Sequence, residues 1–488
     1  MLRKIRIVLA AVSITLVTLL FLDFTGTLHH WFGWLAKIQF LPALLALNAG
    51  VIAALVAITL LFGRVYCSLI CPLGIMQDIF ARFGRMRRKY RYSYSPALTV
   101  LRLVMLALMA ASIILGISAI VVHLAPYSAY GRIAGNLLAP VWMLGNNALA
   151  VVAERADSYA FYSVDVWIKS GLSIAVAAVT LIALGILSWK NGRTYCNTIC
   201  PVGTILGYLS RFSLLRPVID TSKCNACGLC ERNCKAACID SKQHKIDYTR
   251  CVACMNCIDT CRHGAISYTR RHSKTAGADP SQRRSFIATA ATLGTTAALQ
   301  AQEKTVDGGL AAITDKQRPE RRTPIVPPGA KSIKHLSNHC TACQLCVAAC
   351  PNGVLRPSTD LTRLMQPESS YERGYCRPEC TRCSEVCPAG AITPVTREEK
   401  TAVQIGHAVW VADNCVPLTD GVECGNCARH CPAGAIQMVA SDPQDTDSPK
   451  IPVVNTARCI GCGACENLCP ARPFSAIYVE GYEKHRIN

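Results

Sequence analysis

No glycine-rich phosphate loop, nucleotide-binding fingerprint or hydrolytic triad stands out in this sequence of 488 residues. The chain is therefore not expected to bind a flavin or nicotinamide cofactor of its own, because such cofactors need recognisable loops. Acidic residues are also scarce, with 31 Asp and Glu against 51 Lys and Arg and a net charge of +20. Nucleic-acid binding would suit this charge, but the basic residues lie between apolar runs, which favours a membrane protein.

Four segments lack charged residues altogether: 7–22, 41–62, 103–122 and 170–189. A helix rises about 1.5 Å per residue, so each segment is long enough, or nearly so, to cross about 30 Å of hydrocarbon. We predict a four-helix transmembrane domain over residues 1–215. No A-x-A cleavage site follows the first segment, so we interpret it as a retained helix and not as a signal peptide.

Basic residues are distributed unevenly among the connections. The 64–102 connection has eight Lys and Arg and one acid, Asp78, and three more basic residues precede residue 7. The 23–40 and 123–168 connections have one and two. Because basic connections stay inside, the N-terminus, the 64–102 connection and the residues just after 190 are predicted to lie on the cytoplasmic side of a bacterial inner membrane.

Cysteine is abundant, and 24 of the 29 cysteines form six runs of four. In the spacing C-x-x-C-x-x-C-x-x-x-C, three thiolates bind one iron–sulfur cluster and the fourth binds a neighbouring cluster. Disulfides and zinc sites are the alternatives for cysteine pairs. The tight third-to-fourth spacing, followed by proline in four of the runs, favours iron–sulfur, so the sequence predicts six [4Fe–4S] clusters.

The first two runs predict a small two-cluster ferredoxin domain over residues 216–270. Crossed ligation gives one cluster to Cys224, Cys227, Cys230 and Cys261, and the other to Cys234, Cys251, Cys254 and Cys257. Lys235 and Arg262 occupy the positions where proline usually follows the fourth cysteine. A nearby cation favours the more negative, reduced cluster, so we expect raised reduction potentials. Cys238 is left over and is predicted to be a buried free thiol.

The last four runs predict a four-cluster ferredoxin-like module over residues 336–488. The spacing departs from the simple pattern at Cys376/Cys380 and at Cys415/Cys424. We expect the first run to pair with the last and the second with the third. The predicted ligand sets are Cys340, Cys343, Cys346, Cys469; Cys350, Cys459, Cys462, Cys465; Cys376, Cys380, Cys383, Cys431; and Cys387, Cys415, Cys424, Cys427.

The membrane domain contains a repeat, because GRVYCSLICPLG at 63–74 returns as GRTYCNTICPVG at 192–203. Two helix pairs related by a pseudo-two-fold axis would bring four thiols together: Cys67, Cys71, Cys196 and Cys200. Four soft thiolates suit an iron–sulfur centre or Cu(I), which makes them a candidate second metal or redox site. Disulfides, or inert thiols at structural helix ends, are the alternatives.

Residues 271–335 are rich in Arg, Ala, Thr and Pro, have no cysteine, and are interpreted as a linker. Within it, SQRRSFI at 281–287 resembles a twin-arginine export signal, although a plain basic linker is the alternative. Export would place residues 336–488 in the periplasm. His29, His30 and His123 lie at the predicted outer face, where they are candidates for quinol or haem binding or are simply solvated.

The whole sequence then predicts an α-helical membrane domain with a two-fold repeat, followed by two α+β ferredoxin-like modules. Residues 1–265, with four apolar segments, two C-x-x-x-C-P motifs and two cysteine runs, resemble the membrane iron–sulfur subunit of periplasmic nitrate reductase systems, the NapH type. Residues 281–488, with the twin-arginine segment, the PPGA sequence at 327–330 and four runs, resemble the soluble MauM/NapG type of polyferredoxin.

This resemblance implies a fused quinol dehydrogenase component that takes electrons from menaquinol or a similar quinol during anaerobic respiration. The redox partner would be a periplasmic terminal reductase or cytochrome. Two alternatives remain open, a CcoG-like membrane cupric reductase and a redox-sensing scaffold. If the two modules lie on opposite sides, about 30 Å of bilayer separates them, and a quinone site or an intramembrane cofactor has to bridge it. If residues 281–301 do not cross, all six clusters lie in the cytoplasm.

Overall fold

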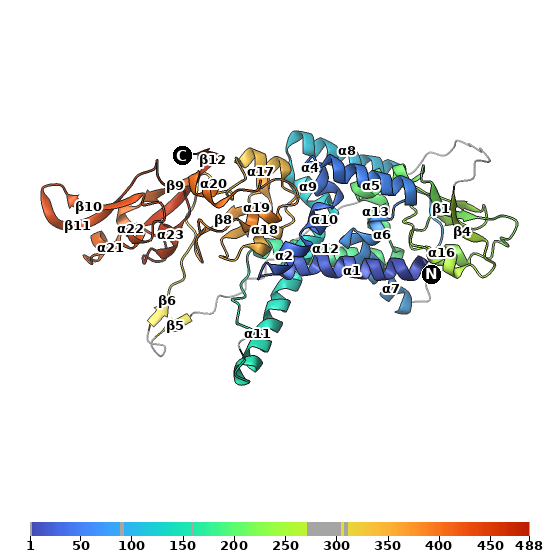
Figure 1. Cartoon of the computed structure of the whole chain (residues 1–488), viewed down its shortest axis with the longest axis horizontal. Helices are drawn as coiled ribbons and strands as arrows, with labels where there is room; N and C mark the ends of the chain where they lie inside the picture. Colours follow the sequence, from blue (N-terminus) through green and yellow to red (C-terminus); the bar gives the residue numbers. More distant parts are fainter. Residues whose placement is uncertain (1, 88–91, 159, 271–303, 307–310, 488) are drawn as a thin grey trace.

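The computed structural model describes residues 2–87, 92–158, 160–270, 304–306 and 311–487. The molecule is elongated, with a layer of helices at its centre (Figure 1). The ferredoxin domain with strands β1 (Leu215–Ile219) and β4 (Ile266–Arg270) lies at one end, and the cysteine-rich C-terminal module lies at the other. The twin-arginine-like segment 281–287 falls outside the described residues.

The helical layer contains helices from all four apolar segments. The first and last form long single helices, α1 (Leu2–Leu22) and α12 (Gly171–Asn191). The two middle segments are broken, which corrects the expectation of single spans: α4 (Phe40–Leu45) precedes α5 (Ala49–Phe62), and α8 (Thr99–Leu115) precedes α9 (Ser118–Leu124). Asn48 caps α5 through the Val51 amide, and Gly116, in the left-handed region at φ 71°, ends α8.

The 123–168 connection is also more structured than predicted. It contains α10 (Pro126–Ile133), a π-helical turn (Ala134–Leu138) and α11 (Ala139–Arg155). Proline suits the first turn of a helix, and Pro126 and Pro140 occupy such positions. All eight residues of α10 are buried, whereas α11 projects away from the long axis (Figure 1).

Three helices in the described part of the chain are long and apolar enough to cross a membrane: Leu2–Leu22, Pro126–Arg155 and Gly171–Asn191. Helices α5 and α8 are apolar but shorter. The N-terminal region is therefore helical with candidate membrane spans, as the composition indicated, but the set of helices differs from the four that were predicted.

The ferredoxin domain that follows the helices is built on the antiparallel pair β1–β4 and a short hairpin of β2 (Ile239–Asp240) and β3 (Lys245–Ile246). Helices α15 (Leu229–Arg232) and α16 (Asn256–Thr260) each carry one cysteine and pack together. We call this unit, residues 215–270, the inner domain.

The C-terminal module has the same kind of parts twice. Helices α18 (Leu345–Ala349) and α19 (Arg382–Val386) pack together, as do α22 (Asn426–Arg429) and α23 (Ala464–Leu468). The pairs β7–β8 (Leu355–Pro357, Pro367–Ser369), β9–β12 (Val403–Trp410, Ile477–Ile487) and β10–β11 (Ile436–Asp442, Asp445–Val454) are antiparallel. We call this unit the outer module.

The outer module begins before residue 336, so the predicted linker boundary is too late. Lys316 donates to the carbonyl oxygens of Glu466, Asn467 and Cys469, and Arg321 pairs with Glu466. Ile325 and Val326 are buried in the module. Two basic residues of the predicted linker are therefore part of the module: Lys316 binds carbonyl oxygens, and Arg321 binds a buried carboxylate.

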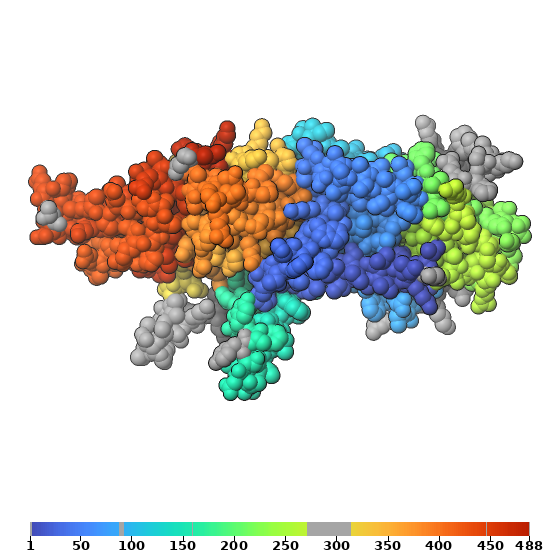
Figure 2. Space-filling view, viewed as in Figure 1, coloured from blue at the N-terminus to red at the C-terminus, as the bar shows by residue number. Residues whose placement is uncertain are grey.

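The outer module packs directly on the helical layer, and Figure 2 shows their surfaces in continuous contact. Lys169 donates to the Val347 carbonyl at 2.7 Å, and Gln344 donates to Ser173 at 2.8 Å. Gly131 of α10 faces the Cys343 carbonyl so closely that a Cβ there would lie 2.4 Å from the oxygen. The buried interior is continuous from Cys234 of the inner domain through the helices to Cys346 of the outer module.

Candidate iron–sulfur sites and the cysteines between them

Five cysteines of the inner domain line one small cavity: Cys238 and the four of one predicted ligand set, Cys234, Cys251, Cys254 and Cys257, which we call the first inner group. The Cys224 and Cys227 thiols contribute to a raised pKa of Cys230, so these three cysteines lie close together. We call them the second inner group. Cys238 is buried, lines the same cavity as the first group, and lies 3.5 Å from the sulfur of Cys234. It is therefore a neighbour of a candidate cluster and not an isolated thiol.

The cysteines of the outer module are grouped differently from the nested pairing that was predicted. Thiols that lie close enough to shift one another's pKa form four sets: Cys340, Cys343, Cys346 and Cys387; Cys350, Cys376, Cys380 and Cys383; Cys415, Cys424, Cys427 and Cys469; and Cys431, Cys459, Cys462 and Cys465. The third set lines a single cavity. The first run thus pairs with the second, and the third with the fourth.

The reason for this grouping is helix packing. Each short helix carries the middle of a run, and α18 packs on α19 while α22 packs on α23. The last cysteine of each run then reaches the partner run, as in a two-cluster ferredoxin. The two halves meet where the Cys376 amide donates to the Cys462 carbonyl at 2.9 Å.

The four cysteines of the C-x-x-x-C-P repeat come together inside the helical layer. Each is at most 3% exposed, and the four thiols lie close enough to influence one another electrostatically: Cys67, Cys71, Cys196 and Cys200. Cys67 lies on α6 (Tyr66–Leu69) and Cys196 on α13 (Thr194–Thr198), while Cys71 and Cys200 directly precede α7 (Pro72–Arg87) and α14 (Pro201–Ser210). We call this set the central cysteines.

The two copies of the repeat exchange equivalent contacts. Arg64 donates to the Cys196 carbonyl at 3.1 Å, and Arg193 donates to the Cys67 carbonyl at 2.6 Å. A Cβ at Gly74 would lie 2.3 Å from the Cys67 carbonyl oxygen, and one at Gly203 would lie 2.2 Å from that of Cys196. These contacts explain why arginine and glycine recur with the cysteines.

Donors also point at the sulfur atoms. The Gln77 amide is 3.2 Å from the sulfur of Cys196, the Gly203 amide is 3.4 Å from that of Cys200, and an Arg64 nitrogen is 3.7 Å from that of Cys67. Hydrogen bonds and cations of this kind stabilise thiolates or a negatively charged centre. The surroundings therefore suit thiolate ligands better than inert thiols.

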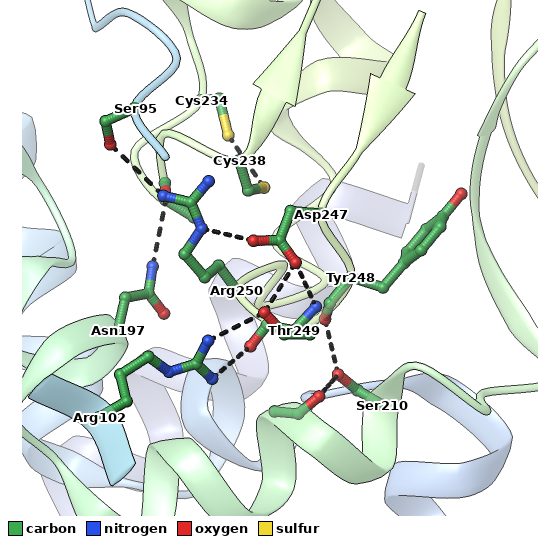
Figure 3. Close-up of polar contacts among 12 residues, drawn as sticks. Ser95, Arg102, Asn197, Ser210, Cys234, Cys238, Asp247, Tyr248, Thr249 and Arg250 are labelled. Carbon is green, nitrogen blue, oxygen red and sulfur yellow. Dashed lines mark hydrogen bonds and ion pairs between the residues drawn. The ribbon is translucent and has the colours of Figure 1, made fainter. Parts of the chain in front are cut away.

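Polar contacts connect the helical layer to the inner domain, and Figure 3 shows those of Arg102, Thr249, Asp247 and Arg250. Arg64 donates to the Thr249 carbonyl at 3.0 Å, and Arg102 donates to the Thr249 hydroxyl at 2.9 Å. Asp247 accepts from Thr249 and Arg250 in turn. Since Thr249 lies two residues before Cys251, Arg64 joins the repeat, and Arg102 joins α8, to the chain that leads into the cavity of the first inner group.

Lys235, which replaces the usual proline, has a structural partner. Its ammonium group lies 2.5 Å from Asp78, which also binds Arg193 and Arg6 at 2.6 and 3.0 Å. Burial alone would raise the pKa of Asp78, but these cations hold it well below its usual range. Asp78 is shared among three cations, so it offsets the Lys235 charge only in part, and Lys235 still acts electrostatically on Cys254 of the first inner group.

The central cysteines also approach the outer module. Tyr195 lies beside Cys196 and Cys200, and it interacts with Arg132 of α10. Arg132 in turn interacts with Cys343 of the outer module. Buried Tyr195 and Arg132 therefore lie between the central cysteines and the outer module.

The three candidate histidines lie in two different places in the structure. His29 and His30 line one cavity at the outer end of the helices, against the outer module. His29 is paired with Asp23, with 3.1 Å between Nδ1 and Oδ2. His123 is exposed on α9 and takes no part in this cavity.

The donor sets fit iron–sulfur clusters. In the described part of the chain, no three Cys, His, Asp or Glu side chains converge as a single-ion site requires. A [4Fe–4S] cluster binds each thiolate through a different iron, so its cysteines need not meet at one point. Cavities lined by four or five cysteines match that arrangement: those of Cys415, Cys424, Cys427 and Cys469, and of the first inner group with Cys238.

Comparison with known proteins agrees with this chemistry. A family profile described as "4Fe-4S binding domain" matches residues 44–91 and 170–219, and one described as "4Fe-4S dicluster domain" matches residues 250–354 and 421–472. The first pair of ranges contains the central cysteines and no others. [4Fe–4S] binding is thus supported by both parts of the chain.

Individual relatives cover parts of the chain. The methylamine utilization ferredoxin-type protein MauM of Paracoccus denitrificans is 32% identical over 170 residues, 33% of this chain and 73% of MauM. The ferredoxin-type protein NapF of Escherichia coli is 28% identical over 161 residues, 32% of this chain and 87% of NapF. The uncharacterized protein MJ0749 of Methanocaldococcus jannaschii is 33% identical over 100 residues, 20% of this chain, and the chain spans 39% of its length. No solved structure matches.

Proposed function

Because the chain belongs to the family of ferredoxin-type iron–sulfur proteins that includes MauM, we propose that it relays electrons from the quinol pool to a terminal reductase. It holds six [4Fe–4S] clusters in this proposal. Its N-terminal half is a NapH-type membrane part fused to a MauM/NapG-type polyferredoxin. When bound, each cluster supplies a one-electron acceptor whose potential the surrounding residues adjust.

The observation that supports this function best is the order of the cysteine groups. The two inner groups lie at one end and the four outer groups at the other, with the central cysteines between them (Figure 1). Hydrogen bonds join the repeat to the inner domain at Arg64 and Thr249 and the two halves of the outer module at Cys376 and Cys462, while buried Tyr195 and Arg132 lie between the central cysteines and the outer module. A continuous row is what stepwise electron transfer needs.

The central cysteines are proposed as an additional redox centre in this row. Their burial, the donors directed at their sulfur atoms and the profile match at 44–91 and 170–219 support an iron–sulfur centre. A cupric reductase would need a copper site, and the described residues offer no single-ion arrangement. Such a centre would bridge the bilayer distance between the two modules.

We propose that the inner domain faces the cytoplasm and the outer module the periplasm. The basic 64–102 connection lies at the inner domain's end, where Tyr94 and Ser95 bind Glu231 and Arg250. Residues of the outer module contact the opposite ends of the helices. Positive charge on the cytoplasmic side then orients the molecule.

The test is anaerobic reduction of the full-length protein in detergent by menadiol, a soluble menaquinol analogue, followed by EPR. We expect several [4Fe–4S] signals to appear with menadiol and all of them with dithionite. If dithionite produces the signals and menadiol produces none, the chain does not take electrons from quinol.

A further inference from the structure

We propose that quinol is oxidised at the outer end of the helices, in the cavity lined by His29, with this histidine accepting a proton from the quinol. The inference rests on the proposed function, which names quinol as the donor but not where it binds. The cavity has a volume of about 460 Å³ and lies between α2 (Thr27–Phe32), α3 (Trp34–Lys37) and α19 of the outer module.

His29 is prepared to accept a proton. Its side chain is 9% exposed, and Nε2 is buried in the cavity wall without a hydrogen-bond partner. Nδ1 lies 3.1 Å from Asp23, which also accepts from the amides of Gly26 and His29 and from Thr25. Burial would raise the pKa of Asp23, but these hydrogen bonds outweigh it and hold the pKa below its usual range.

An ionised Asp23 fixes the histidine tautomer. The carboxylate accepts a hydrogen bond from Nδ1–H, so the lone pair of the neutral ring lies on Nε2. The same carboxylate stabilises the imidazolium that forms when Nε2 takes a proton. A buried histidine with a free Nε2, held by a carboxylate and lining a cavity, is suited to general base catalysis.

The cavity also has the other features that a quinol needs. Trp34 lines it and is 56% exposed, and Trp31 nearby is 72% exposed. Tryptophan is enriched at membrane–water interfaces, so these rings mark an approach from the lipid side. Lys37 and Arg382 also line the cavity, and Arg382 donates to the Thr25 carbonyl, so two cations lie at the wall where the second quinol oxygen would bind.

The acceptors of the electrons lie at the wall of the cavity. Ala349, Arg382 and Val386 line it, and each directly precedes a cluster cysteine, Cys350, Cys383 or Cys387. These cysteines belong to the first two groups of the outer module. Electrons released here enter the outer module without crossing the helical layer.

The reaction balances as follows. Quinol breaks two O–H bonds and becomes quinone, losing two protons and two electrons. The electrons go one each to two oxidised [4Fe–4S] clusters of the outer module. One proton goes to His29 Nε2, and the other goes to water.

A second cavity, of about 270 Å³, lies at the opposite end of α1 against the inner domain. Five basic side chains line it: Arg3, Arg6, Arg82, Arg85 and Lys235. Its one acid, Asp78, is already bound by three cations. Among its described lining residues it offers no histidine to accept a proton, so it serves as the control site.

The experiment uses the full-length protein in detergent, prepared anaerobically, with two readouts. Menadione binding is followed by equilibrium dialysis, and cluster reduction by menadiol is followed by EPR and absorbance. His29→Gln is expected to retain menadione binding within a few-fold and to slow menadiol reduction about 10²-fold or more. Trp34→Leu is expected to weaken menadione binding, and because Trp34 is exposed this variant should fold normally.

The matched control is Ala11→Phe, which fills the cavity beside the inner domain. It should leave binding and reduction unchanged. The inference is overturned if Ala11→Phe abolishes menadiol reduction, or if His29→Gln and Trp34→Leu both behave like the native protein. Iron content and dithionite reduction show whether each variant has kept its clusters. If menadiol fails to reduce even the native protein, the proposed function fails and not merely the site.

Discussion

Cys238 shows how a residue outside the ligand sets can act on a cluster. Its sulfur lies 3.5 Å from that of Cys234, and it lines the cavity of the first inner group. Hydrogen bonds to cluster sulfurs stabilise the reduced, more negative state and raise the reduction potential. The leftover cysteine of the sequence is therefore a candidate for adjusting this potential.

Replacing it tests that role. Cys238→Ala removes the S–H donor, so the potential of one inner cluster should become more negative, as measured by redox titration monitored by EPR. Cys238→Ser, which keeps a donor, is the control and should shift the potential less. Loss of four irons from Cys238→Ala would instead identify Cys238 as a ligand.

His485 predicts a pH dependence of stability. Burial lowers its pKa from about 6.5 to about 4, and neither ring nitrogen has a hydrogen-bond partner. Between these values the unfolded chain binds the extra proton and the folded chain does not, so stability falls as the pH falls below 6.5. The loss should reach about 2 kcal/mol at pH 5.

The measurement is denaturant unfolding of the native protein and of His485→Leu between pH 5 and 7.5. The variant should lose this part of the pH dependence while keeping that of other groups. If the free energy of unfolding changes with pH by the same amount in the two proteins, His485 is not held neutral in the folded state.

Among the elements, α10 joins the helical layer to the outer module. It is completely buried, and Gly131 leaves room for the Cys343 carbonyl, which a Cβ would approach to 2.4 Å. Gly131→Ala should therefore destabilise the protein by about 1–3 kcal/mol, since neither backbone can move freely.

Gly135, one turn further on, is the matched control. A Cβ there meets no atom within 4 Å, so Gly135→Ala should be neutral or slightly stabilising. Thermal unfolding in detergent compares the two. Equal effects of the two substitutions would contradict the close contact at Gly131.

Some elements could be predicted from the sequence and others could not. The uncharged runs at 7–22 and 170–189 predicted α1 and α12, because length and hydrophobicity are local properties. The breaks at Leu47 and Gly116 and the buried helix α10 were missed, because single-residue backbone conformations and tertiary burial leave weak local signals.

The candidate sites show the same division. Spacing identified the cysteine runs, because it depends on short stretches of chain, and the four cysteines of one crossed set line a single cavity together with Cys238. The nested pairing of the outer runs was wrong, since the packing of α18 on α19 and α22 on α23 decides which runs meet. The Asp23–His29 pair was missed as a pair, although an acid six residues before a histidine was visible in the sequence.

For the whole molecule, the central cysteines decide whether the two halves form one electron-transfer path. Cys196→Ser removes a thiolate that Gln77 approaches at 3.2 Å. We expect the inner and outer clusters to keep their iron but electron exchange between them to become much slower, as seen by rapid-freeze EPR after a flash-generated reductant. Cys238→Ser, which makes the same replacement of sulfur by oxygen, is the control. If electron exchange between the inner and outer clusters is as fast in Cys196→Ser as in the native protein, the central cysteines are not part of the electron-transfer path.

The central claim is that the six runs bind iron–sulfur clusters, and metal and sulfide content measures it most directly. Protein purified without oxygen should contain about 24 iron and about 24 sulfide atoms per chain, with any excess assigned to the central cysteines, and should show [4Fe–4S] signals after reduction. Far less iron, or zinc in its place, would contradict the account.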